Sequence, residues 1–124
     1  MAVLGLHHTG VHVSSLARSI RFYEEVFGLR LSQRLSFGGE ELAFVSTGPG
    51  WVELIEDGSG GRPTGVVDHI ALEVNDLDGH VQRLVGRGIP LLDQSPVAVP
   101  ALGARILFCL GPDGERIELL EHVR

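Results

Sequence analysis

The sequence predicts an α+β fold built from two copies of one module, each consisting of a strand, a helix and three further strands. The stretch that begins at His8 returns at His69, and residues 52–56 return as residues 117–121. Seventeen glycines and six prolines separate short apolar runs, which is typical of a chain with many strands and turns. The repeat and the turns together indicate a duplicated module.

The two copies are joined by a short segment of turn-forming residues. Residues 58–65 consist mainly of Gly, Ser, Pro and Thr, a composition that favours a linker. We therefore expect one domain over the 124 residues, made of modules at residues 1–57 and 66–124.

The first module has clear local signals for each element. Its first strand alternates, with Thr9, Val11 and Val13 on one face. A helix then begins after Ser14 or Ser15 and stops at Gly28, with an apolar stripe of Leu16, Ile20, Tyr23 and Phe27. A Gly-Gly turn predicts a hairpin after the helix. The strands are expected at residues 8–13, 31–37, 41–46 and 51–56.

The second module repeats this pattern. Ile70, Leu72 and Val74 form the apolar face of its first strand. Its helix is expected to begin at Asn75 or Asp76 and to end at Gly88, with Leu77, Val81 and Leu84 buried. Because each helix must cover the apolar face of its strands, the opposite face, which carries the histidines, is left facing a concavity.

Charge and cysteine content exclude several classes of protein. Sixteen acidic residues oppose ten basic ones, all of them Arg, which gives a formal charge of −6. Such a chain repels a phosphate backbone, so we expect no nucleic-acid partner. No apolar stretch is long enough to span a bilayer, and Cys109 has no second cysteine to bridge, so we expect a cytoplasmic protein without membrane contact.

Four residues occupy corresponding places in the two modules and have metal-ligating side chains. His8 and His69 lie early in the first strands, and Glu53 and Glu118 lie in the last strands. By strand parity all four point to the concave face, and two imidazoles with two carboxylates are a ligand set for a borderline divalent ion. His7 is in the wrong register for this face. The sequence predicts one ion per site, with Ni, Zn, Fe, Mn or Co as candidates.

The same face suggests further roles. Glu53 or Glu118 is expected to serve also as a catalytic proton shuttle beside the ion, which would act as a Lewis acid and stabilise an enediolate. His12, Trp51 and Glu73 share the face by parity and are expected to contact substrate.

Several motifs resemble the vicinal oxygen chelate superfamily, which includes glyoxalase I, methylmalonyl-CoA epimerase, extradiol dioxygenases and the fosfomycin and bleomycin resistance proteins. The resemblance covers essentially the whole chain. The motifs are residues 6–11, 19–23, 26–29, 52–54, 68–71 and 111–119. The resemblance implies a glyoxalase-like fold, in which tandem βαβββ modules form a cupped, partly open mixed β-barrel around a metal.

The ligand pattern is most similar to that of bacterial glyoxalase I. His8, Glu53, His69 and Glu118 stand where its four ligands stand. One departure is His12, because glyoxalase I usually has an Arg there that grips a glutathione carboxylate. The resemblance also agrees with a homodimer, which we expect because two small modules leave sheet edges exposed.

Three functions follow from these observations. The first is a metal-dependent lyase or isomerase, similar to glyoxalase I, that acts on a small oxygenated substrate. The second is a mononuclear Fe(II) dioxygenase acting on an aromatic or polyketide-like substrate, for which His8, His69 and Glu118 would serve as the triad. The third is a binding or resistance protein for a small molecule.

Overall fold

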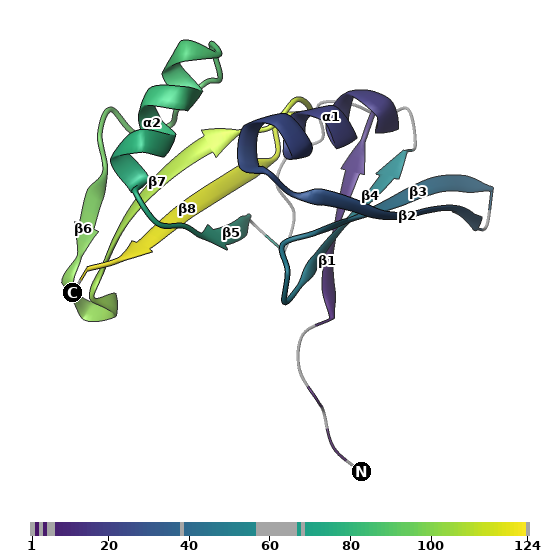
Figure 1. Cartoon of the computed structure of the whole chain (residues 1–124), viewed down its shortest axis with the longest axis horizontal. Coiled ribbons are helices and arrows are strands. Elements are labelled where there is room, and N and C mark those ends of the chain that lie inside the picture. Colours follow the sequence, from purple (N-terminus) through teal and green to yellow (C-terminus); the bar gives the residue numbers. More distant parts are fainter. Residues whose placement is uncertain are drawn as a thin grey trace. The chain divides into compact units, whose positions relative to one another are not determined.

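The computed structural model contains the predicted two modules, seen as two sets of strands, each with its own helix (Figure 1). It describes residues 2, 4, 7–37, 39–56, 67 and 69–123, and the predicted linker at residues 58–65 lies outside them. The chain divides into two compact units, Met1–Gly61 and Arg62–Arg124.

The first module has the predicted order of strand, helix and three strands. Strands β1 and β4 are parallel neighbours, while β3 pairs antiparallel with both β4 and β2, so that the sheet order is β1-β4-β3-β2. The hairpin begins one residue earlier in each strand than predicted. The elements are β1 (His8–Val13), α1 (Leu16–Phe27), β2 (Arg30–Phe37), β3 (Glu40–Ser46) and β4 (Trp51–Glu56).

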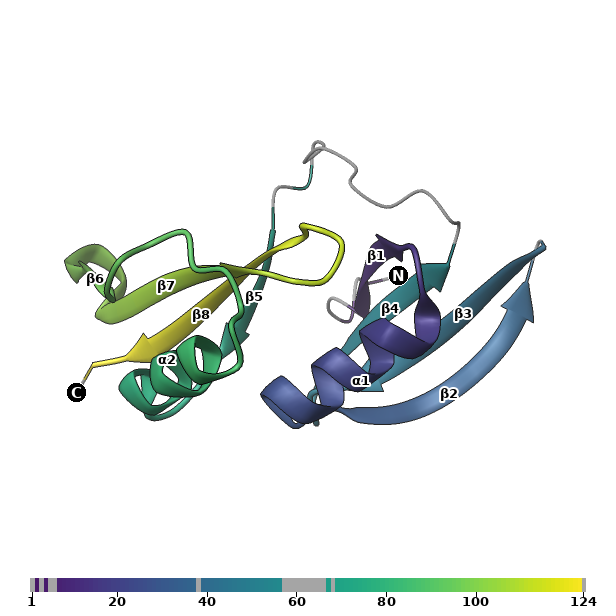
Figure 2. The same ribbon diagram turned by 90° about the horizontal axis from the view of Figure 1, so that it is seen from above.

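Helix α1 covers one face of this sheet, as Figure 2 shows. Its caps are local. Ser15 accepts a hydrogen bond from the backbone N–H of Arg18, and Gly28 takes the left-handed conformation that ends the helix. The buried stripe ends in Val26, whereas the predicted Phe27 is half-buried and packs edge-on against Phe22. The core between helix and sheet is formed by Val11, Val13, Leu16, Ile20, Tyr23, Val26, Ala43, Val45, Val52 and Leu54.

The second module repeats this topology, but the strand at the outer edge of its sheet is shorter. Its sheet order is β5-β8-β7-β6, with β5 parallel to β8. Pro96 and Pro100 flank the edge strand and cannot donate backbone hydrogen bonds, which agrees with its length of three residues. The elements are β5 (Ile70–Glu73), α2 (Leu77–Gly86), β6 (Val97–Val99), a 3₁₀ turn η1 (Pro100–Leu102), β7 (Ala104–Leu110) and β8 (Arg116–His122).

The core of the second module differs in detail from the sequence prediction. Leu72 and Val81 are only half-buried, so neither belongs to the fully enclosed core. Asp76 is the N-cap of α2, and its carboxylate accepts from the backbone N–H of Gly79. The helix ends two residues before Gly88, which has a positive φ. The buried hydrophobic side chains are Ile70, Leu77, Leu84, Ala104, Leu107, Cys109, Ile117 and Leu119.

A carboxylate at the end of each last strand ties the helix to the sheet. Glu56 of β4 accepts a hydrogen bond from the backbone N–H of Leu16, at 2.6 Å, and Glu121 of β8 accepts one from Leu77, at 3.0 Å. Each carboxylate therefore satisfies one of the free N–H groups at a helix N-terminus. The sequence repeat contains both glutamates, but their capping role depends on tertiary contact.

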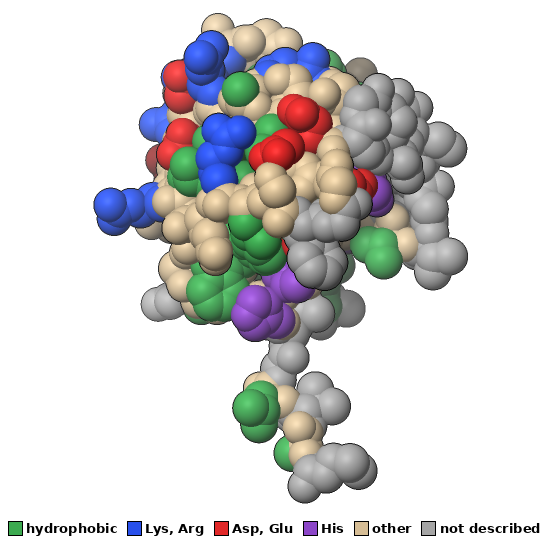
Figure 3. All heavy atoms as spheres, turned by 90° about the vertical axis from the view of Figure 1, so that its right-hand side faces the viewer, with side chains coloured by type: hydrophobic (Ala, Val, Ile, Leu, Met, Phe, Trp, Pro, Cys, Tyr) green, Lys and Arg blue, Asp and Glu red, His purple; other side chains and the backbone are tan. Residues whose placement is uncertain are grey.

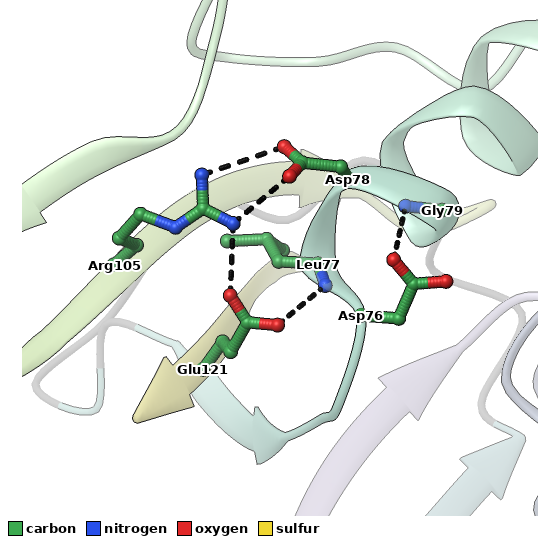
Figure 4. Close-up of polar contacts among 6 residues, drawn as sticks. All are labelled: Asp76, Leu77, Asp78, Gly79, Arg105 and Glu121. Carbon is green, nitrogen blue, oxygen red and sulfur yellow. Dashed lines mark hydrogen bonds and ion pairs between the residues drawn. The ribbon is translucent and has the colours of Figure 1, made fainter. Parts of the chain in front are cut away.

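The second module adds an arginine to this contact. Arg105 of β7 lies between Asp78 on α2 and Glu121 on β8, with N–O distances of 3.1 and 2.8 Å (Figure 4). The hydrogen bond from Arg105, followed by that from Leu77, lowers the pKa of Glu121, and the same two carboxylates raise the pKa of Arg105. Within the described ranges, neither α1 nor α2 is long and apolar enough to cross a membrane.

Candidate functional site

The first module brings His8 and Glu53 together on the face opposite the helix. Glu53 on β4 pairs in register with Gly10 on β1, two residues along the strand from His8, so both side chains point the same way. The Nε2 atom of His8 lies 3.5 Å from Oε1 of Glu53. A Cβ at Gly10 would lie 3.4 Å from Oε1 of Glu53, an ordinary van der Waals distance.

The second module repeats the pair with the same register. Glu118 on β8 pairs with Ala71, two residues after His69, which immediately precedes β5. The Nε2 atom of His69 lies 3.0 Å from Oε1 of Glu118. In both pairs the carboxylate is the more enclosed partner, with side chains 17% exposed for Glu53 and 12% for Glu118, against 35% for His8 and 33% for His69.

A phenylalanine completes each pair, and the sequence prediction missed it. Phe44 on β3 lies opposite Glu53, and its ring meets His8 edge-on with centroids 5.3 Å apart. Phe108 on β7 lies opposite Glu118 and meets the ring of His69 in the same way at 5.0 Å. The two rings stand at matching places in the sequence repeat, a signal of a shared role that does not by itself place them beside the histidines.

Each pair fits the donor geometry of a divalent metal ion. Two donors bound at about 2.1 Å lie about 3.0 Å apart in adjacent octahedral positions and about 3.4 Å apart in a tetrahedral site. The observed separations of 3.0 and 3.5 Å, which are those of direct imidazole–carboxylate contacts, also leave the two donors spaced as such an ion requires, and imidazole nitrogen with carboxylate oxygen suits a borderline ion. Among the described residues no group of three or more His, Cys, Asp or Glu side chains gathers closely enough to hold an ion. The four-ligand set therefore stays a prediction.

The residues predicted to contact substrate lie at different distances from the pairs. Trp51 pairs in register with His8, and His12 is exposed further along the same face of β1. Glu73 is largely exposed and its carboxylate lies 3.8 Å from Nε2 of His122. Their roles stay predictions.

His7 contacts the first pair, although the sequence placed it in the wrong register. Its Nδ1 atom lies 2.9 Å from Nδ1 of His8, and its ring stacks on Trp51. His7 precedes β1, so strand alternation does not determine its direction. Both histidines are exposed, and Figure 3 shows histidine side chains at the surface beside hydrophobic ones.

Comparison with known proteins identifies the family to which the chain belongs. The sequence profile of the Glyoxalase/Bleomycin resistance protein/Dioxygenase superfamily matches residues 5–119. The chain belongs to this superfamily, and its two βαβββ modules have the glyoxalase-like fold. This confirms the family and the fold that the sequence motifs indicated.

Two relatives and one solved structure are similar to this chain over more than nine tenths of its length. The chain is 35% identical to the uncharacterized protein YwbC of Bacillus subtilis (strain 168), over 94% of this chain and 97% of that one. It is also 35% identical to the lactoylglutathione lyase of Salmonella typhimurium (strain LT2), over 94% and 91%. Among solved structures, the trypanothione-dependent glyoxalase I of Leishmania major is similar, with a TM-score of 0.77 and 27% identity over 92% and 84%.

Proposed function

We propose that this chain is a divalent-metal-dependent lyase or isomerase, similar to glyoxalase I, acting on a small oxygenated substrate. The observation that carries the proposal is the repeated trio of histidine, glutamate and phenylalanine, which occurs once in each module with the same strand register. A duplicated structural core would not need an imidazole–carboxylate pair on its uncovered face. If both pairs bind a metal ion, this one role explains why each module carries such a pair.

In this proposal His8, Glu53, His69 and Glu118 hold one ion, supplied by one chain or by two copies. The ion, when bound, would polarise a substrate oxygen and acidify the neighbouring C–H group. Glu53 or Glu118 would take up the proton at a carboxylate oxygen and return it to the adjacent carbon. Phe44 and Phe108 contact the imidazole rings edge-on and so restrict how those rings can turn.

The reaction class is supported by the relatives. Two of the proteins that are similar to this chain are a lactoylglutathione lyase and a trypanothione-dependent glyoxalase I, as their names state. The presence of His12, where the glyoxalase I pattern has Arg, favours a substrate that is not held through a glutathione carboxylate at that point.

Metal content provides the direct test. After chelator-free purification we expect about one divalent ion per four-ligand site, and loss of the ion in His8→Ala and in His69→Ala. His122→Ala is the matched control, since it removes another imidazole that lies near a carboxylate, in the same module as His69. Full metal occupancy in both site variants would refute the proposed ligand set.

Activity assays then separate the reaction classes. The metal-loaded protein should isomerise or cleave one of three substrate types: 2-oxoaldehyde hemithioacetals, acyl-CoAs or other small 2-oxo compounds. Oxygen consumption with Fe(II) and a catechol would instead support the dioxygenase. A protein that binds no metal but retains a small hydrophobic compound would support the binding function.

We also propose that the chain forms a homodimer. The edge strand β6 pairs only with β7 in its sheet, and Val97 and Leu102 beside this edge are 47% and 57% exposed. Burial of these apolar side chains against a second copy of the chain would remove them from water and favour association. Light scattering at micromolar concentration should give twice the chain mass, and a monomer would refute this proposal.

A further inference from the structure

His8 is held on two sides by neighbouring rings. Its Nε2 atom faces Glu53, and its Nδ1 atom lies 2.9 Å from Nδ1 of His7. Phe44 meets the imidazole edge-on at an interplanar angle of 88°, and His7 meets it edge-on at 83°. The direction of Nε2 is therefore set by contacts on the rest of the ring.

The contact with His7 involves the nitrogen that a metal would leave free. If Nε2 of His8 gives its lone pair to an ion, the ring proton must lie on Nδ1, which then needs a hydrogen-bond acceptor. Nδ1 of His7 is at hydrogen-bond distance and can accept in its neutral form. An outer acceptor of this kind fixes the tautomer and the orientation of a ligating histidine.

Trp51 in turn holds His7. The two rings stack with centroids 4.9 Å apart and an interplanar angle of 28°, so the imidazole of His7 has a flat support on β4, the strand that also carries Glu53. A fixed acceptor loses less conformational entropy when its hydrogen bond forms than a free side chain does. The contacts that run from His8 through His7 to Trp51 therefore connect β1 with β4, which are neighbouring strands of one sheet.

In the second module an arginine stands at the position that corresponds to Trp51, so this ring stack is not repeated there. The first residue of β8 is Arg116, whose guanidinium carbon lies 5.1 Å from the ring centre of Phe108. The residue before His69 is Asp68, which lies outside the described residues. The two imidazole–carboxylate pairs therefore have different surroundings in the described structure, although their cores match.

We propose that His7 is a positioning residue for His8, and that Trp51 holds it there. The hydrogen bond accepted by His7 would keep the proton of His8 on Nδ1 and leave its Nε2 lone pair available to a bound ion. This inference rests on the proposed metal function, and it assigns no direct metal contact to His7.

Two variants separate the hydrogen bond from the ring contact. His7→Phe keeps a flat ring on Trp51 and removes the acceptor, whereas His7→Asn places a carbonyl oxygen close to the position of Nδ1 and removes the ring. The probe is Co²⁺ alone, titrated into the metal-free protein and followed by its visible absorption bands. We expect His7→Phe to weaken Co²⁺ binding about 10- to 100-fold and His7→Asn to restore it to within about threefold of the wild type.

The controls keep this test distinct from that of the proposed function. His122→Phe should bind Co²⁺ as the wild type does, and thermal unfolding should show that both His7 variants are folded. If the wild type binds no Co²⁺, the metal function fails and this inference fails with it. If the wild type binds but His7→Phe binds equally well, or if His7→Asn binds as weakly as His7→Phe, the metal site stands and the assigned role of His7 is refuted.

Discussion

Ser19 is a buried polar residue whose removal should stabilise the protein. It lies in the middle of α1, is 0% exposed, and its hydroxyl oxygen has no hydrogen-bond partner among the residues described. A buried hydroxyl that loses water without gaining a partner is unfavourable by about 1–3 kcal/mol. Ser19→Ala removes that group and leaves the surrounding apolar contacts in place.

The size of the effect can be worked out from the site. Relief of the unpaired hydroxyl is partly offset by the small void left by one oxygen atom, worth a few tenths of a kcal/mol at about 24 cal/mol per Å³. Alanine also has a higher helix propensity than serine, by about 0.5 kcal/mol. We expect a net gain of about 1–3 kcal/mol, which for 124 residues corresponds to an increase in Tm of about 4–12 °C.

Ser15 provides a matched control on the same helix. Its hydroxyl accepts the N–H of Arg18 as the N-cap, so Ser15→Ala should lower the free energy of unfolding by about 0.5–2 kcal/mol. Urea unfolding followed by circular dichroism measures both variants. Two serine-to-alanine changes four positions apart should thus have opposite signs. A Ser19→Ala variant that is less stable than the wild type would show that the hydroxyl has a partner, and would refute the reasoning.

Three further predictions concern the second module. The lowered pKa of Glu121 means that its carboxylate stabilises the folded chain at neutral pH, and that this contribution is lost as the pH falls through the lowered pKa. The free energy of unfolding in urea should therefore differ less between about pH 7 and about pH 3 for Arg105→Gln than for the wild type. Burial raises the pKa of Cys109 to about 12, so a thiol reagent at about pH 8 should modify it only after unfolding in guanidinium chloride, and rapid labelling of the native protein would contradict its burial. Leu119→Ala should cost about 2–5 kcal/mol of stability by leaving a cavity, while metal analysis should find the ion content unchanged.

The elements could be predicted because their signals are local. The alternation of residues 8–13, the N-cap at Ser15 and the left-handed Gly28 each act over a few residues, and the structure has them where the sequence indicated. The pairing of histidine with glutamate also followed from strand parity, because both modules repeat the same pattern.

Contacts that depend on register or on tertiary position could not be predicted in the same way. The place of Phe44 beside His8 requires the pairing of β3 with β4, which alternation along one strand does not contain. Val26 replaces Phe27 in the core because the rotation of α1 on the sheet decides which side of the stripe is enclosed. The stacking of His7 on Trp51 joins residues from two strand ends and has no local signal.

The position of β4 and β8 inside their sheets affects how the protein can diverge. Each is hydrogen-bonded along both sides, β4 to β1 and β3, and β8 to β5 and β7, so a shift of either strand would break two ladders at once. Insertions in the β2–β3 hairpin or next to β6 disturb only the outer edge of a sheet. Mutation at these edges can therefore change the surroundings of each imidazole–carboxylate pair while the strand that carries its glutamate keeps its place in the sheet.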